Sequence, residues 1–149
     1  MPDLTPAEFK AQLKPMTQII GIDYGVKRIG VAVSDLMRMT ATPLKIVANM
    51  AELQKLIAER EVGGFVVGLP RLMNGQEGEQ AATTRAWVAK LKERIDLPVL
   101  FWDERLSSKA VTRIFVEQAD LSRKRQKEIT DKVAAAYILQ NALDLLANI

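Results

Sequence analysis

The 149-residue chain contains neither cysteine nor histidine. Without cysteine there are no disulfides, no thiolate nucleophile and no cysteine-bound zinc, and without histidine the usual imidazole ligands and bases are missing. Chemistry in this chain must therefore use carboxylates, lysine, serine or tyrosine. The sequence also lacks an apolar run of the roughly 18 residues that a membrane span needs, and its N-terminus lacks the apolar centre of a signal peptide. We therefore expect a cytoplasmic protein without a membrane partner.

The composition, with 48% hydrophobic and 26% charged residues, is typical of a globular domain. A chain of this length buries one substantial core but not two. We assign residues 1–16, which hold prolines and a short amphipathic piece, to a peripheral N-terminal arm, and residues 17–149 to a single domain. The net charge of +3 is compatible with a nucleic-acid partner but is too small to indicate one. We expect a monomer or a weak dimer.

The pattern of apolar residues predicts an α/β fold. Strands at 18–23 and 29–33 form a hairpin with Gly25 in its turn, and 44–47 is a third antiparallel strand. The remaining chain alternates helices and strands: helix 50–60 ended by Gly63 and Gly64, strand 65–69, helix 79–94, strand 99–103, a helix capped by Ser107 or Ser108, a basic helical linker, and helix 131–147. Parallel crossovers that follow antiparallel hairpins predict a mixed five-stranded sheet with helices on both faces. We assign five further residues to the core: Ala82, Ala86, Trp87, Leu91 and Trp102.

Three acidic residues stand at the edges of different predicted elements: Asp23, Glu104 and Asp131. Asp23 ends the first strand and Glu104 follows the last one, at the strand ends where catalytic residues of such sheets gather. Asp103 is the alternative to Glu104, because the alternation of side chains does not decide between them. If the three carboxylates meet, they form an all-oxygen site suited to Mg²⁺ or Mn²⁺.

The direction of Asp131 on its helix is the clearest of these signals. At about 100° per residue, four apolar residues lie within roughly 40° of Asp131: Ala135, Ile138, Ala142 and Leu145. The carboxylate therefore lies in the apolar stripe and faces the sheet, where burial without a partner is costly. A position at the helix N-terminus, capped by Thr130, explains its place along the helix but not its direction.

Basic residues accompany these acids. Lys27 and Arg28 stand beside Asp23, Arg105 follows Glu104, and a cluster precedes the last helix: Arg123, Lys124, Arg125 and Lys127. Such a run is most often a solvated helix face. Beside carboxylates that hold metal ions, the same side chains are candidates for phosphate contacts that give affinity without sequence readout.

The end of strand 65–69 and the connection after it carry Gly68, Pro70, Asn74 and Gly75. It is not a P-loop, because it lacks the Gly-Lys-Ser/Thr ending. Two interpretations stay open. It is a flexible link between a strand and a helix, or it is a lid or a backbone phosphate site at the start of the next helix.

Four segments together resemble the YqgF/RuvX family of Holliday-junction-resolvase-like proteins, in the correct order between Gln18 and Leu146: GIDYGVKRIGVAVSD, VVGLPRLMNGQEG, DERLSS and SRKRQKEITDKVAAAYILQ. The resemblance implies an RNase H-like fold, a cytoplasmic location and a nuclease that matures the 5′ end of pre-16S rRNA, with ribosomal precursor particles as partners. It puts the family's acidic positions on Asp23, Glu104 and Asp131. It puts the family's glycine motif on Gly68, Leu69, Pro70 and Gly75.

The leading hypothesis is a nuclease that depends on Mg²⁺ or Mn²⁺. Asp23 would bridge two ions, with Glu104 and Asp131 each holding one of them. RNA is favoured over DNA as the substrate. Two alternatives stay open: a non-catalytic RNA-binding or assembly module, and a resolvase that acts on DNA junctions, because a shared fold does not determine a substrate.

Overall fold

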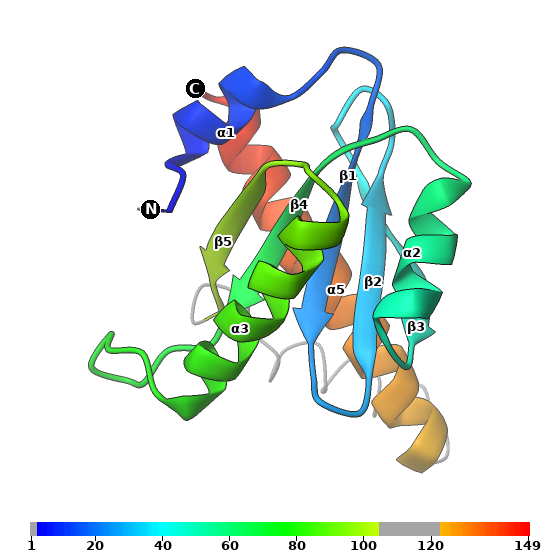
Figure 1. Ribbon diagram of the computed structural model, residues 1–149, viewed down its shortest axis with the longest axis vertical. Coiled ribbons are helices and arrows are strands. Elements are labelled where there is room, and N and C mark those ends of the chain that lie inside the picture. The colour runs from blue at the N-terminus through cyan, green and yellow to red at the C-terminus, as the bar shows by residue number, and fades with distance from the viewer. Residues whose placement is uncertain (1–2, 105–122) are drawn as a thin grey trace.

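In the computed structural model, the backbone is described for residues 3–104 and 123–149, and the side chains for residues 3–104 and 133–149 (Figure 1). The elements follow one another along the chain as α1 (Pro6–Gln12), β1 (Gln18–Tyr24), β2 (Ile29–Ser34), β3 (Ala41–Val47), α2 (Met50–Ala58), β4 (Val62–Leu69), α3 (Glu79–Arg94), β5 (Val99–Asp103) and α5 (Arg123–Ala147). The helix predicted after Ser107 or Ser108 lies outside the described residues.

The five strands form one mixed sheet in the order β3-β2-β1-β4-β5. β1 pairs antiparallel with β2, and β2 pairs antiparallel with β3. β4 lies parallel to β1, with Ile22 opposite Val67, and β5 lies parallel to β4. The predicted mixed sheet of three antiparallel strands followed by parallel ones is confirmed. Because β1, β4 and β5 run in the same direction, their carboxyl ends share one edge.

Helices cover both faces of this sheet, also as predicted (Figure 1). On one face Ile20 and Ile22 of β1 pack in a core cluster with Leu53 of α2 and Leu91 of α3. On the other face the alternate residue Ile19 packs in a cluster with α5. The period-two alternation of β1 thus divides its apolar residues between two layers. No helix in the described part of the chain is long and apolar enough to cross a membrane.

The N-terminal arm is docked on the α5 side of the sheet. Phe9 of α1 is completely buried in the same cluster as α5. Thr5 and Glu8 form a capping box that starts α1. The Lys10 Nζ donates hydrogen bonds to the carbonyl oxygens of Leu146, in the last turn of α5, and of Ile149, just after it, at 2.7 and 2.8 Å. The assignment of a separate peripheral arm up to residue 16 stays a prediction.

Gly63 and Gly64 do not end the helix before them, and this expectation was wrong. α2 ends at Ala58, and both glycines lie inside β4. A Cβ on Gly64 would lie 3.0 Å from the ring of Phe9, and one on Gly63 would collide with the side chain of Thr17. The glycines therefore allow close packing of the N-terminal segment on the strand.

The buried face of α3 also differs from the expected one. Ala82 and Ala86 are exposed, whereas Leu91 is buried as expected. The buried stripe consists of Ala81, Thr84, Val88 and Leu91. Thr84 tolerates burial because its hydroxyl donates a hydrogen bond of 2.9 Å to the carbonyl oxygen of Gln80. Because the Thr84 hydroxyl is hydrogen-bonded within α3, Thr84 can take a buried position. The buried face of α3 therefore differs from the face that hydrophobicity alone indicates.

Candidate functional site

Asp23 lies near the carboxyl end of β1, in the middle of the sheet. It pairs with Gly30 of β2 on one side. On the other side, one residue beyond the Ile22–Val67 pair, it is level with Gly68 of β4. Only 6% of Asp23 is exposed. A buried carboxylate at the edge where three parallel strands end is a costly placement that an ordinary turn residue does not need.

The side chain of Asp23 projects on the α5 face of the sheet. Gly21, two residues earlier on β1, contacts α5 so closely that a Cβ there would lie 2.7 Å from the Leu139 Cβ and 2.9 Å from the Ala135 carbonyl oxygen. Side chains two residues apart on a strand share one face. Asp23 therefore points into the layer between the sheet and α5.

Glu104 reaches the same face from the end of β5. A Cβ on Gly68 would lie 2.7 Å from the Glu104 Oε1 and 2.9 Å from its Cγ. It would also lie 2.7 Å from the Cδ1 of Ile138 on α5. The side chain of Glu104 therefore crosses the end of β4, over the bare Cα of Gly68, toward Asp23. The missing side chain of Gly68 is what lets a carboxylate from β5 approach one from β1, two strands away.

Asp103 is directed elsewhere. Its Oδ2 lies 3.9 Å from the Nε of Arg71 in the loop after β4. Asp103 and Glu104 are successive residues, so their side chains leave the chain on opposite sides. The contact with Gly68 favours Glu104 over Asp103 as the second acid of the candidate site.

The backbone places residue 131 toward the edge of the sheet at which β1 ends. α5 crosses the sheet obliquely, in the direction opposite to β1, with its N-terminal end at the edge where β1, β4 and β5 end (Figure 1). Starting from the contact between Gly21 and Ala135, two residues along β1 cover about 6.6 Å and four residues back along α5 cover about 6 Å. The two lengths are similar, so the backbone of residue 131 lies near the edge of the sheet at which Asp23 stands. The side chain of Asp131 lies outside the described residues.

The apolar stripe predicted for the last helix is largely confirmed. Ala135, Ile138 and Ala142 are buried. Leu145 is 39% exposed, so its assignment to the stripe was wrong. At the C-terminal end of α5 the buried positions are instead Leu143 and Leu146, which shifts the contact face around the helix by part of a turn. α5 also begins at Arg123, so the predicted basic linker belongs to the same helix.

Among the described side chains, no three acidic residues lie close enough together to hold a metal ion. Asp23 and Glu104 are two of the three candidates, and the third side chain is not described. Carboxylate oxygens are the donors that Mg²⁺ and Mn²⁺ prefer, so the residues present fit an ion of this class.

Two basic candidates lie in the turn between β1 and β2. Lys27 is exposed at the tip of this turn. Arg28 is half-buried, and its buried Nη1 makes no hydrogen bond within the described part of the chain. Arg105 and the side chains of Arg123, Lys124, Arg125 and Lys127 lie outside the described residues.

The loop after β4 is closed by its own hydrogen bonds. The amide of Leu72 donates to the carbonyl oxygen of Gln76, and the amide of Gly75 donates to that of Leu72, both at 2.8 Å. Gly75 has a φ of 87°, which favours glycine. Asn74 accepts a hydrogen bond of 3.0 Å from the amide of Gln76. Asn74 and Gly75 therefore shape this turn, and Pro70 lines the pocket described below.

Arg85 on α3 joins this loop to the N-terminal arm. Its guanidinium donates to Glu77 at 2.6 Å and to Asp3 at 2.9 Å. It also lies over the ring of Phe101, 4.7 Å from the centroid. The hydrogen bonds from Arg85 lower the pKa of both carboxyl groups, and the two carboxylates raise the pKa of Arg85. One cation therefore holds together three segments beside the candidate site.

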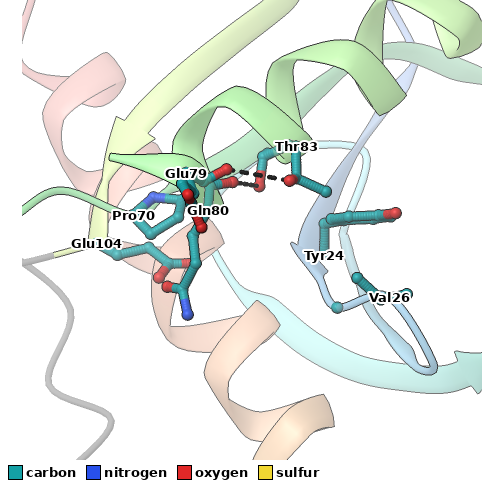
Figure 2. Close-up of a pocket in the computed structure, with 9 residues that line it drawn as sticks. Tyr24, Val26, Pro70, Glu79, Gln80, Thr83 and Glu104 are labelled. Carbon is teal, nitrogen blue, oxygen red and sulfur yellow. Dashed lines mark hydrogen bonds between the residues drawn. The ribbon is translucent and has the colours of Figure 1, made fainter. Parts of the chain in front are cut away.

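A pocket of about 320 Å³ adjoins Glu104 on the side of α3 (Figure 2). It is lined by Tyr24, Gly25, Val26, Pro70, Glu79, Gln80, Thr83, Thr84 and Glu104. Sequence patterns did not single out this set, because its members come from the ends of four different elements. An aromatic pair stands at its rim: Tyr24 stacks on Trp87, with ring centroids 4.8 Å apart.

Both tryptophans pack against the core, as expected. Trp87 adjoins the cluster on the α2 and α3 side, and Trp102 adjoins the cluster on the α5 side. Each is only partly buried.

Comparisons with known proteins agree with this architecture. A model of the RuvX family, described as Holliday junction resolvase, matches residues 17–145. A Rhodobacter capsulatus protein named "Putative pre-16S rRNA nuclease" is 49% identical over 148 residues, covering 95% of this chain and 92% of that protein. A protein of the same name from Paramagnetospirillum magneticum is 46% identical over 150 residues, covering 97% and 96%.

Among solved structures, RuvC from Thermus thermophilus in complex with a Holliday junction substrate is similar, with a TM-score of 0.51 and 16% identity. The match covers 82% of this chain and 91% of that one. At this identity the similarity shows the fold alone, and the expected RNase H-like fold is confirmed.

Proposed function

Because the chain belongs to the RuvX family, we propose that it is a nuclease that hydrolyses phosphodiester bonds with the help of bound Mg²⁺ or Mn²⁺. The family and the RNase H-like fold support phosphodiester hydrolysis. The metal dependence is inferred from the available ligands. In a chain without cysteine or histidine, the charged side chains that can bind a metal ion are carboxylates, which suit Mg²⁺ and Mn²⁺.

The observation that carries this proposal is the placement of Glu104 over Gly68. It brings a second carboxylate across β4, toward the buried Asp23, on the face that α5 covers. Asp131 is the third ligand in the proposal, because its backbone on that helix lies near the same edge of the sheet. Asp23, Glu104 and Asp131 would hold the ions, which when bound activate water and stabilise the leaving oxygen.

The rest of the chain positions the substrate. Lys27 and Arg28 lie in the hairpin turn that follows β1, close to Asp23 in the sequence, and would neutralise phosphates of the nucleic-acid backbone. Arg105 and the basic first turns of α5, which carry Arg123, Lys124, Arg125 and Lys127, extend this function in the proposal. Such contacts give affinity without sequence readout and a strong dependence on salt.

We infer that the substrate is RNA, at the 5′ end of the 16S rRNA precursor, in the cytoplasm. The names of the relatives that match most of the chain at 46–49% identity support this substrate, and ribosomal precursor particles would then be the partners. A junction resolvase acting on DNA is the second candidate, because the RuvC structure of similar fold was solved with a Holliday junction.

The test compares three variants with a matched control. Asp23→Asn, Glu104→Gln and Asp131→Asn should each abolish cleavage of an end-labelled 16S precursor RNA while leaving RNA binding intact. Asp144→Asn is the control, since the Asp144 side chain is exposed on α5 and accepts a hydrogen bond from Gln140. Binding of Mn²⁺, followed by electron paramagnetic resonance, should weaken in the three variants and not in the control.

Two results would contradict the proposal. Cleavage that survives in Asp23→Asn would exclude the acidic site as its origin. A wild-type protein that binds RNA but cleaves neither the precursor RNA nor a four-way DNA junction, in either metal, would instead indicate a non-catalytic module.

A further inference from the structure

The pocket beside Glu104 has an aromatic wall. Tyr24 follows Asp23 directly on β1, and its ring stacks on Trp87 of α3 at an interplanar angle of 28°. The stack occupies one face of the Tyr24 ring. In Figure 2 Tyr24 and Val26 border one side of the pocket, and Pro70, Gln80 and Glu104 border the other. The pocket therefore joins an aromatic surface to the candidate acidic site.

Some polar groups of this pocket are already hydrogen-bonded within the protein, and others are open to a ligand. The hydroxyls of Thr83 and Thr84 donate to the carbonyl oxygens of Glu79 and Gln80 within α3, at 3.0 and 2.9 Å. By contrast, the carboxamide of Gln80 and the carboxylate of Glu79 make no hydrogen bond or ion pair within the described part of the chain. Both are exposed. A ligand can therefore exchange hydrogen bonds with the Gln80 carboxamide, which donates and accepts, and can donate to the Glu79 carboxylate, which accepts.

The volume suits a ligand with one or two rings. About 320 Å³ lies at the lower end of the range of about 300–1,000 Å³ that small-molecule sites occupy. Apolar walls from Val26 and Pro70 with a few polar groups on one side are typical of a site for a flat heterocycle.

We propose that this pocket binds one unpaired nucleobase of the substrate, adjacent to the phosphate that lies at the acidic site. The base stacks against Tyr24, and its polar edge meets Gln80 and Glu79. Stacking on an aromatic side chain tolerates any base, and unstacked bases are what proteins recognise in single-stranded RNA. The site thereby favours substrates that are single-stranded or frayed at the cleaved position. This inference rests on the proposed nuclease function.

The experiment uses binding rather than cleavage. Two fluorescein-labelled hexamers are compared by fluorescence anisotropy in EDTA: one of six abasic tetrahydrofuran phosphates, and one with a single adenine in place of a central abasic unit. With only one base present, only the register that places this adenine in the pocket can gain affinity from the site. We expect the wild-type chain to bind the adenine hexamer about tenfold more tightly.

The variants separate stacking from folding. Tyr24→Ala should bind the two hexamers equally, Tyr24→Phe should keep the preference, and Gln80→Leu should reduce it. Tyr137→Ala is the matched control, because Tyr137 lies on α5, 38% exposed and outside the pocket. If circular dichroism shows that Tyr24→Ala is unfolded, the exposed Gln80→Leu decides, and an unchanged preference there refutes the site.

The two proposals fail separately. Equal binding of the two hexamers by the wild-type chain, or a preference that survives in folded Tyr24→Ala, overturns the nucleobase site even if the protein cleaves RNA. A base preference in a chain that cleaves no nucleic acid leaves the site in place and overturns only the nuclease function.

Discussion

Replacing Gly68 with alanine would place a methyl group 2.7 Å from the Glu104 Oε1 and 2.7 Å from the Ile138 Cδ1. The φ angle of Gly68 is not positive, so the cost arises from crowding alone. Overpacking costs about 1–3 kcal/mol. Because the two closest atoms are the ends of flexible side chains that can move aside, we expect the free energy of unfolding in urea to fall by only about 1 kcal/mol. Because Glu104 must leave its position over β4, Mn²⁺ affinity and the rate of RNA cleavage should fall by about tenfold or more.

A second substitution separates stability from the site. Ile138→Val removes the Cδ1 that the new methyl group would meet, and by itself it costs about 1 kcal/mol. In the double variant Gly68→Ala/Ile138→Val that collision is absent. The double variant should therefore lose about 0.5 kcal/mol less stability than the sum of the two single losses. Mn²⁺ binding and cleavage should stay low, because the collision with Glu104 remains. Wild-type Mn²⁺ affinity and cleavage in Gly68→Ala would refute the placement of Glu104 across β4.

Three further predictions concern other parts of the molecule. Phe9→Ala should lower the free energy of unfolding by about 3–5 kcal/mol, as measured in urea, because Phe9 is completely buried. Lys27→Ala should weaken RNA binding alike for all sequences and reduce the slope of log affinity against log salt by about one. Arg85→Gln should lose more stability at pH 7 than in acid, where Glu77 and Asp3 become protonated, as measured by urea unfolding at a series of pH values. Hydrogen bonds from Arg85 lower the pKa of Glu77 and Asp3 from ordinary values of 4.5 and 3.8, so their contribution is complete above those values and lost as the pH falls through the lowered ones. A loss of stability in Arg85→Gln that stays the same at every pH would contradict this.

The order of strands and helices was predictable because apolar runs and alternation are local signals. β1, α3 and β5 lie where the sequence places them, with α3 and β5 at the predicted bounds. Gly63 and Gly64 misled the prediction because a glycine pair usually ends an element. Their role depends on Thr17 and Phe9, which pack on them from a segment more than forty residues away. A contact of this kind leaves no local pattern.

The sequence singled out the three acidic residues one at a time, but it did not show how Glu104 approaches Asp23. Strand order alone puts β4 between Asp23 and Glu104, a separation of about two strand spacings of 4.8 Å. What shortens it is Gly68, which lies in β4, inside the strand predicted at 65–69, and faces α5. The sequence does not show that this glycine leaves room for Glu104. The pocket around Tyr24 escaped prediction for a similar reason, since its walls come from β1, α3 and the ends of β4 and β5.

Glycines on the α5 face connect packing to the site. Gly21 lets α5 approach β1, since a Cβ there would meet the Ala135 carbonyl oxygen at 2.9 Å. Gly68 does the same for β4, and it also makes room for Glu104. Both contacts set the distance between α5 and the sheet, and with it the position of residue 131 relative to Asp23. A substitution that lifts α5 from the sheet should therefore reduce activity even where it touches none of the acids.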